Sequence, residues 1–534
     1  MTLMRPYAVF VSLAATFGGF VWAFDATVIS GVVPFLKQYF GLNGTQGDLK
    51  LGLGVSCLGW GVLGGTAISG LLSGRFGRKR ILIVTAALLG VSAWMSALAT
   101  SFPVFVASRV LGGIGVGGTI LVAPAYIAEV SPSNSRASLG SLNQLMIVTG
   151  ISASFFSNRF LLDAGQNNWR WMLGVGAIPA AAYFLLLFGV PESPRWLLGK
   201  GQEEKAREVL GRICGKQEGE AELRRIRESL AKGPAGHGLG GLLGRKMRWV
   251  IWIGVAIAFF QQITGISAVF YYLPSIFVQA GGSLDSAFWQ AAVVGLVNLG
   301  MTLVALWLMD RIGRKPLLII GVAGMAAAAL TCSWAFDSAT YQLTAKSYEM
   351  LQAGKVPPDF MADLKSAEGH VFATDKEFVA DMEKRFGADQ IKPYRDALAA
   401  AALNIRATVV FWAIIGFVAS FAFSLGPAMG VLLTEIFPQE CRGGAMSLVG
   451  FWNVAVSASV TFIFPWEWSH LGSAGTFLAY GLFALAALVF IVAGIPETRG
   501  KSLEELESIL VRSPAKTCAG PSPATKRNRP LSIP

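Results

Sequence analysis

Counted at the helical rise per residue, five carboxamide side chains from four long apolar runs of the sequence lie at similar depth, near the middle of the runs. They are Gln144, Gln261, Gln262, Asn298 and Asn453. A carboxamide carries donors and an acceptor on one uncharged group, which matches the hydroxyl groups of a neutral polyol. An amide without a partner is costly in an apolar environment, so these side chains must bond to one another or to a polar ligand. The alternative is that they only hold neighbouring helices together.

One carboxyl group and one guanidinium group also fall inside apolar runs, at Asp25 and Arg109. Counted at the helical rise per residue, Asp25 lies about 26 Å from one end of its run and Arg109 about 10 Å from the opposite end, so their depths agree. A nearby cation favours the ionised form of a carboxyl group, and its departure favours protonation. We hypothesise that protonation of Asp25 releases Arg109 and permits a conformational change. The alternative is a permanent structural ion pair.

The composition requires a membrane environment. Of 534 residues, 53% belong to the set AVILMFWYC and 14% are charged, whereas a soluble protein carries about a quarter charged residues. This excess of apolar surface excludes a soluble enzyme, and we expect no catalytic residues. The net charge of +12 comes mostly from short loops beside apolar runs. That placement is typical of membrane topology and not of nucleic-acid binding.

Apolar runs long enough to cross about 30 Å of hydrocarbon predict twelve transmembrane helices. Basic residues gather in the loops 74–80 and 310–316, so the positive-inside rule places these loops and both termini in the cytoplasm. The first run is too long for a signal-peptide core, and we expect it to remain as an uncleaved span. The predicted spans are 8–34, 51–73, 81–100, 103–128, 137–160, 170–190, 248–273, 287–309, 317–336, 406–433, 444–464 and 473–495.

The two halves of the chain repeat each other. RFGRK at 75–79 recurs as RIGRK at 311–315, and PESPR at 191–195 recurs as PETRG at 496–500. Two six-span halves of parallel topology are expected of a transporter whose site lies between its repeats. The predicted domains are a six-helix bundle at 1–190, a cytoplasmic helical linker at 191–247, a second six-helix bundle at 248–510 with an extracytoplasmic insertion at 337–404, and a disordered cytoplasmic tail at 511–534.

The sequence offers little for other chemistries. Its five cysteines contain no CxxC pair and its three histidines are dispersed, so we predict no metal, no disulfide and no cofactor. The segment GGIGVGG at 112–118 resembles a dinucleotide-binding loop, but it lies inside an apolar run with no strand before it. Close packing of helices explains these glycines better.

With these motifs, the chain resembles the sugar porter family of the major facilitator superfamily, except over 337–404 and the tail. The resemblance implies an all-α membrane fold with twelve transmembrane helices in two pseudo-symmetric six-helix bundles and short cytoplasmic helices. It also implies alternating access. Bacterial proton-coupled sugar symporters look closest, because Asp25 stands where facilitative carriers have an amide. The motifs are GRFGRKR (74–80), RVLGGIGVGG (109–118), PESPRW (191–196), QQITGISAVFYY (261–272), DRIGRKP (310–316), EIFPQECRG (435–443) and PETRGKSLEELE (496–507).

The resemblance also implies roles for single residues. Independently of the resemblance, Asp25 and Arg109 are expected to provide the proton coupling. Charged groups at the cytoplasmic helix ends are expected to pair across the bundle and hold the outward-facing state, with simple topology signals as the alternative. The positions that correspond to the family's sugar site are Gln144, Gln261, Gln262, Ser267, Tyr271, Asn298 and Asn453. The expected gating charges are Arg75, Arg78, Glu129, Arg136, Glu192, Arg195, Arg311, Arg314, Glu435 and Arg442.

Three positions depart from the family's sugar site. Ser267 stands in place of an Asn, and Gly430 and Val454 each stand in place of a Trp. Loss of two aromatic platforms should enlarge the site, so the substrate is expected to be larger or less typical than glucose or xylose.

The sequence therefore predicts a monomeric secondary active transporter of the cell membrane that imports a neutral sugar or polyol with a proton. Its expected partners are that sugar or polyol, the proton and the lipid bilayer, without nucleic acid. One alternative is an uncoupled facilitative sugar carrier. The other is a transport-inactive sugar sensor. The outer insertion and the two missing tryptophans suggest this alternative.

Overall fold

The computed structural model describes residues 6–131, 136–231, 245–345, 347–348, 351, 360–361, 364–372, 375–391, 394–437 and 442–497. Long helices dominate this part of the chain. Its first half contains α1 (Pro6–Thr27), α2 (Ile29–Tyr39), α3 (Gly44–Phe76), α4 (Arg78–Leu98), α5 (Phe102–Val130), α6 (Arg136–Leu161), α7 (Asn168–Gly174) and α8 (Ala177–Gly189). Its second half contains α13 (Arg245–Ile263), α14 (Ile266–Gln279), α15 (Leu284–Ile312), α16 (Arg314–Asp337), α22 (Ala407–Phe423), α23 (Leu425–Ile436) and α24 (Arg442–Gly494).

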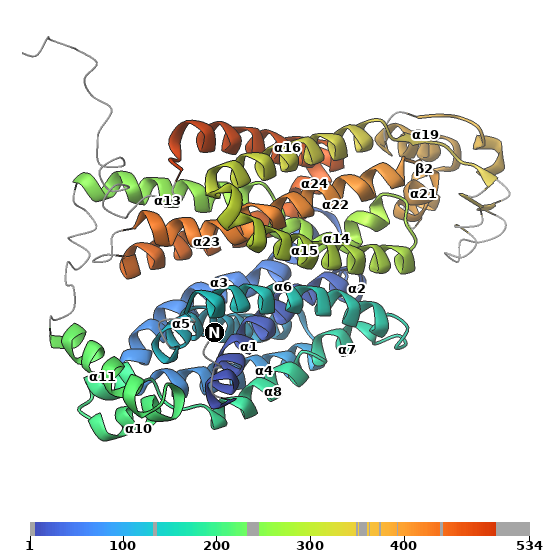
Figure 1. Ribbon diagram of the computed structural model, residues 1–534. Coiled ribbons are helices and arrows are strands. Elements are labelled where there is room, and N and C mark those ends of the chain that lie inside the picture. The colour runs from blue at the N-terminus through green and yellow to red at the C-terminus, as the bar shows by residue number, and fades with distance from the viewer. Residues whose placement is uncertain are drawn as a thin grey trace, which may run out of the picture.

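These helices form two bundles, one from each half of the chain (Figure 1). Helices α1 to α8 make the first bundle and α13 to α24 the second, and most of them run in roughly the same direction. The linker helices α10 (Glu203–Ile213) and α11 (Lys216–Ala231) lie at one end, and α19 (Asp375–Phe386) and α21 (Arg395–Ala402) lie at the other. We call these the inner and outer ends, after their predicted cytoplasmic and extracytoplasmic sides. The all-α, two-bundle fold is thus confirmed.

Ten segments of the described chain are long and apolar enough to cross a membrane. Four of them join two helices each, because short breaks divide α1 from α2, α7 from α8, α13 from α14 and α22 from α23. The longest segment, α24, contains a non-helical Gly472 and so comprises two helices. The remaining predicted span corresponds to α6, which is not among the ten segments found within the described residues. The number twelve itself stays a prediction.

Glycines bring α3 and α5 into backbone contact. A side chain at Gly113 or Gly117 would overlap the carbonyl oxygens of Leu58 or Val62, and one at Gly61 would overlap the carbonyl oxygen of Val110. Only glycine admits such an approach, as in other closely packed membrane helices. The GGIGVGG segment therefore serves helix packing.

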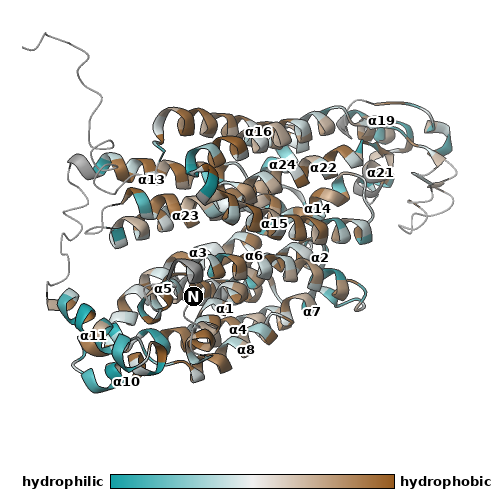
Figure 2. Ribbon diagram, viewed as in Figure 1, coloured by the Kyte–Doolittle hydropathy of each residue, from teal (hydrophilic) through white to brown (hydrophobic). Residues whose placement is uncertain are grey.

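Two smaller units lie at the ends of the bundles. At the inner end, α9 (Pro194–Gly199), α10 and α11 share a small apolar core around Leu197, Leu210 and Leu223. These linker helices are markedly more hydrophilic than the bundles (Figure 2). At the outer end, the insertion has its own apolar core, which includes Phe378 and Met382. Its other elements are β1 (Thr340–Tyr341), η1 (Lys365–Ala367), α20 (Ala388–Ile391) and β2 (Leu403–Asn404), with β1 and β2 antiparallel.

Candidate functional site

Three amides of the second bundle form one hydrogen-bonded cluster. Asn453 Nδ2, on α24, donates to Gln261 Oε1 at 2.8 Å, and Gln262 Nε2 donates to Asn453 Oδ1 at 3.2 Å. Gln261 Nε2 also donates to the carbonyl oxygen of Leu425 at 2.8 Å. Both glutamines are buried. The first of the two helices of α24, the end of α13 and the start of α23 therefore meet at these side chains.

Two hydroxyl groups extend this amide cluster. Ser267 Oγ donates to Gln262 Oε1 at 2.7 Å, and Ser457 Oγ donates to Ser267 Oγ at 2.8 Å. Sequence reasoning missed Ser457, although it stands one helical turn after Asn453, a spacing that places both on one face of α24. Ser267, which stands in place of the family's Asn, thus still takes part in the polar cluster.

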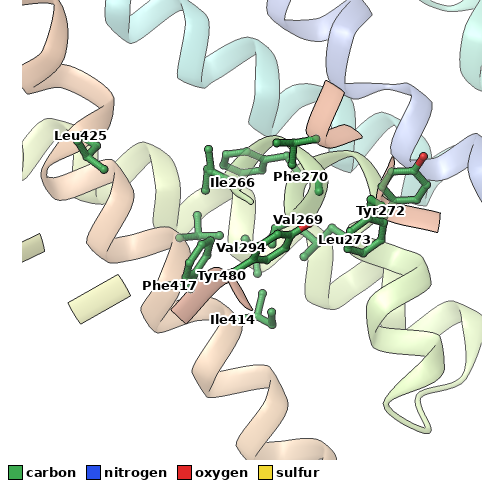
Figure 3. Close-up of a cluster of buried hydrophobic side chains, with 14 of the residues drawn as sticks. Ile266, Val269, Phe270, Tyr272, Leu273, Val294, Ile414, Phe417, Leu425 and Tyr480 are labelled. Atoms are coloured by element: carbon green, nitrogen blue, oxygen red, sulfur yellow. The ribbon is translucent and has the colours of Figure 1, made fainter. Parts of the chain in front are cut away.

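A break in the helix between α13 and α14 places these groups. Gly265 has φ +89°, and a side chain there would overlap the ring of Tyr480. Only glycine adopts this left-handed conformation without strain. Figure 3 shows Tyr480 beside Val269 and Phe417, within the apolar core around this break. The break turns the chain so that Ser267, five residues later in sequence, reaches back to Gln262.

The other predicted sugar-site residues lie outside this hydrogen-bonded cluster. Asn298 on α15 is buried, and its Nδ2 atom has no partner among the described residues. Gln144, on α6 of the first bundle, is half-buried. Tyr271 packs against the apolar cores of both bundles. The structure thus joins Gln261, Gln262, Ser267 and Asn453, and gives no described hydrogen bond from them to Gln144, Tyr271 or Asn298.

Asp25 and Arg109 meet inside the first bundle. Arg109 Nη1 donates to Asp25 Oδ1 at 3.1 Å, and Nη2 donates to the main-chain carbonyl oxygen of Asp25 at 3.0 Å. The exposed fractions of the two residues are 1% for Arg109 and 5% for Asp25. Arg109 is therefore bound to the α1 backbone as well as to the carboxylate.

The surroundings of this pair leave one carboxylate oxygen unpaired. Within the described residues, Asp25 Oδ2 has no hydrogen-bond partner. A side chain at Gly112 would lie 3.5 Å from this oxygen and overlap Ser92 Oγ, so glycine keeps the space open. The other ionisable groups near the pair are Cys57 of α3, which interacts with Arg109, and Tyr271 of α14, which interacts with both charges. Tyr271, from the amide-bearing bundle, thus interacts electrostatically with both charges of the pair.

The charged motifs build one cluster at the inner end of the first bundle. Arg78 Nη2 lies 2.9 Å from Glu129 Oε1, and Ser193 Oγ donates to the other Glu129 oxygen at 2.5 Å. Glu192 Oε1 accepts from the main-chain nitrogens of Arg78 and Lys79, at 2.9 and 3.2 Å. A carboxylate at a helix N-terminus satisfies free N–H groups, so Glu192 caps α4.

The second bundle repeats this arrangement. Arg314 Nη2 lies 2.8 Å from Glu435 Oε1, and Glu497 accepts from the main-chain nitrogens of Arg314 and Lys315 at 3.2 and 3.1 Å. The sequence repeat is therefore also a structural repeat. Both ion pairs join helices of one bundle.

The other predicted gating charges have separate surroundings. Arg75 lies over the ring of Phe76, the next residue in the sequence. Arg311 lies over the ring of Trp307, one helical turn earlier. Arg442 Nε donates to the carbonyl oxygen of Phe437, and Arg195 is exposed. The side chain of Arg136 lies outside the described residues.

The two bundles are joined towards their outer ends. Ser152 Oγ of α6 donates to the carbonyl oxygen of Gly295 in α15 at 2.7 Å. About two helical turns further out along α6, Arg159 forms an ion pair with Asp285 of α15. A side chain at Gly52 of α3 would overlap the carbonyl oxygen of Phe462 in α24. These contacts close the outer side of the bundle interface, and sequence reasoning had not selected any of these residues.

Comparison with known proteins gives a consistent result. A model of the family "Sugar (and other) transporter" matches residues 11–353 and 397–510. The arabinose-proton symporter of Bacillus subtilis is 31% identical, covering 95% of this chain and 96% of that protein. The D-xylose-proton symporter of Escherichia coli is 32% identical, covering 96% and 97%.

Solved structures of the E. coli xylose transporter also match. Its partially occluded inward-open conformation gives a TM-score of 0.72 at 29% sequence identity, covering 93% of this chain and 100% of that chain. The form bound to 6-bromo-6-deoxy-D-glucose gives a TM-score of 0.69 at 31% identity, covering 94% and 99%. The similarity therefore extends over both bundles.

Proposed function

Because the chain belongs to the sugar (and other) transporter family, we propose that it is a secondary active transporter that imports a neutral sugar or polyol together with a proton. The family consists of integral membrane transporters, and curated relatives that span nearly the whole chain are named as sugar-proton symporters. The observation that carries the proposal is the buried Asp25–Arg109 pair, with which Tyr271 of the amide-bearing bundle interacts electrostatically.

The amide cluster provides the sugar site in this proposal. Its amide and hydroxyl groups can exchange their mutual hydrogen bonds for bonds to sugar hydroxyls without creating a net charge. Asn298, with its unpartnered Nδ2 atom, offers a further donor, and Gln144 and Tyr271 complete the site when the bundles close on the sugar. Exchange of existing bonds keeps the empty site stable, because buried amides then always have partners.

The ion pair couples the proton to this movement. Asp25 takes up a proton at its unpaired Oδ2 atom, which weakens its attraction for Arg109. Arg109 then moves away, and the bundles reorient around the sugar. On release of the proton, the ion pair forms again. A ligand can shift the equilibrium between the outward-facing and inward-facing states only as far as its affinities for the two states differ. Sugar and proton must therefore both favour the same change of conformation.

The gating charges act at the inner end. We propose that the clusters around Glu129 and Glu435 hold the helix ends of each bundle as rigid units and pair across the interface in the outward-facing state. Loops that carry the basic motifs, together with both termini, face the cytoplasm, and the protein functions as a monomer in the cell membrane. In this arrangement the linker 191–247 lies under the bundles and the insertion 337–404 lies outside.

Reconstituted protein tests the function directly. Proteoliposomes are loaded with a pH-sensitive dye in weak buffer, and pentoses, hexoses and polyols are added one at a time. A symporter carries protons inward with its substrate, so the dye-containing lumen becomes acidic for the transported sugar and for no others. Uptake of radiolabelled sugar without any pH change would indicate the facilitative carrier, and absence of uptake for every sugar that binds would indicate the sensor.

A further inference from the structure

The first transmembrane span is weakened just beyond Asp25. Val28 is the single residue between α1 and α2, and it separates the helices although its torsion angles, φ −57° and ψ −25°, remain helical. Pro34 follows inside α2 and cannot donate to the carbonyl group of Ser30, four residues earlier. The segment 25–34 therefore lacks part of the hydrogen-bond ladder that stiffens a helix, so its carbonyl groups can accept from other donors. The Val28 carbonyl oxygen also accepts from the main-chain nitrogen of Gly31 at 3.3 Å.

Two side chains from other helices supply such donors. Arg109 of α5 donates to the carbonyl oxygen of Asp25 at 3.0 Å. Asn158 of α6 donates through Nδ2 to the carbonyl oxygen of Val28 at 3.1 Å, and the same atom lies 3.4 Å from Ser30 Oγ. Asn158 is 1% exposed, so this amide has no access to solvent. We call this segment, with its two donors, the clamped break.

Close packing holds the Asn158 amide in place. A methyl group added at Gly31 would lie 2.5 Å from both Cγ and Nδ2 of Asn158. Glycine at this position therefore lets the amide lie directly against α2. Neither the sequence pattern nor the proposed sugar and proton sites had assigned a role to Asn158.

The helix that carries Asn158 also joins the two bundles. On α6, Ser152 bonds to Gly295 across the interface and Arg159 pairs with Asp285. On the other side of the break, α2 lines a cavity of about 280 Å³ at the outer end together with α14 and α24. The clamped break thus lies between the ion pair and the outer contacts of the bundles.

We propose that Asn158 is a positioning residue for proton coupling, which together with Arg109 holds α2 in the outward-closed position. This inference rests on the proposed function. When Asp25 is protonated, Arg109 leaves the carboxylate and the Asp25 carbonyl group at the same time, and one of the two clamps opens. Asn158 then sets how far α2 is free to move, so it decides whether opening of the outer side depends on the proton.

Thiol labelling from outside tests this role without requiring a known substrate. Ser275 of α14 lines the outer cavity, and we choose Ser275→Cys as the reporter for a membrane-impermeant maleimide. Protein without this substitution measures the background from the five native cysteines. Asn158→Ala should raise the labelling rate about fivefold or more, because it removes the hydrogen bonds from α6 to the Val28 carbonyl group and to Ser30 in the closed state. Gly31→Ala should do the same, because its methyl group displaces the amide.

The matched control is Ser154→Ala on the same helix. Ser154 is fully buried, and within the described residues its hydroxyl group bonds only to the Ile151 carbonyl of its own helix. Its removal should leave labelling within twofold of the parent. An equal rise in Ser154→Ala and Asn158→Ala, or no rise in Asn158→Ala and Gly31→Ala, would overturn the proposal.

A double-mutant cycle separates positioning from general loosening. Asp25→Asn should raise labelling in the parent, and this rise should shrink at least twofold when Asn158→Ala is present, because the two clamps hold the same helix, α2. An unchanged rise would show that Asn158 acts independently and would overturn the proposal. These measurements need neither sugar nor a proton gradient, so failure of proton-coupled uptake in the parent would refute the proposed function separately.

Discussion

Arg109 binds Asp25 twice, through the carboxylate and through the main-chain carbonyl oxygen of the same residue. The guanidinium group presents several donors in one plane, so it can hold both acceptors at once. A charge change at the carboxylate is therefore felt directly by the α1 backbone. This relationship gives the ion pair a mechanical consequence as well as an electrostatic one.

The neutral variant Asp25→Asn should abolish accumulation of sugar against a gradient, because its amide cannot exchange a proton with the medium. Exchange of labelled for unlabelled sugar should persist, since it needs no net proton movement. Both are measured in proteoliposomes, with and without an imposed pH gradient. Intact accumulation by this variant would contradict the coupling role.

The variant Arg109→Leu should destabilise the folded protein by about 3–5 kcal/mol, because it leaves a buried carboxylate without its counter-ion. Adding Asp25→Asn removes that unpaired charge and should recover part of the loss. Denaturant unfolding in a lipid or detergent mixture measures both. A double variant no more stable than Arg109→Leu would mean that packing, rather than charge, determines the effect.

Removal of the central amide by Gln261→Ala should weaken sugar binding roughly tenfold or more, because bonds to Asn453 and to the sugar are lost together. The control is Gln290→Ala on α15, since the Gln290 amide donates to Ser286 near the outer end, away from the amide cluster. Binding is measured by the shift in thermal stability with sugar concentration. Equal losses in both variants would argue against a specific sugar site.

The variant Gly313→Ala should cost about 1–3 kcal/mol of stability, because φ is +102° there and the methyl group would lie 2.9 Å from Glu497 Oε2. The control is Gly300→Ala inside α15, where no neighbouring atom lies within 4 Å. That change should be neutral or stabilising by up to about 1 kcal/mol, as expected for alanine in a helix. Thermal unfolding of the two purified variants gives the comparison.

Excision of the outer insertion should leave transport intact. Thr340 pairs with Asn404 and Tyr341 with Leu403, so the two ends of the insertion lie side by side. A two-residue Asn-Gly turn can join such antiparallel ends in place of residues 342–402. Because the insertion has its own apolar core, its loss should expose little of the bundle. Uptake within about twofold of the full chain is expected, and loss of uptake with normal expression would assign the insertion a role in transport.

The fold class and the internal repeat could be predicted from the sequence because both depend on local patterns. Hydropathy over about twenty residues decides which segments can enter a bilayer. The spacing of RFGRK and RIGRK identified the two halves, and their charges form equivalent clusters at Glu129 and Glu435. The depth of Asp25 and of Arg109 also followed from the constant rise of a helix, and the two residues are in contact.

Tertiary structure decided which groups face each other. Depth along a helix says nothing of its rotation or of the distance to its neighbours, so Gln144 and Asn453 could share a predicted level while only Asn453 joins the amide cluster. Ser457 and Asn158 were not selected, because only packing against Ser267 and Val28 gives them a role. Those contacts depend on helix rotations and close approaches set by glycines such as Gly31 and Gly265, which arise only when all the helices pack together.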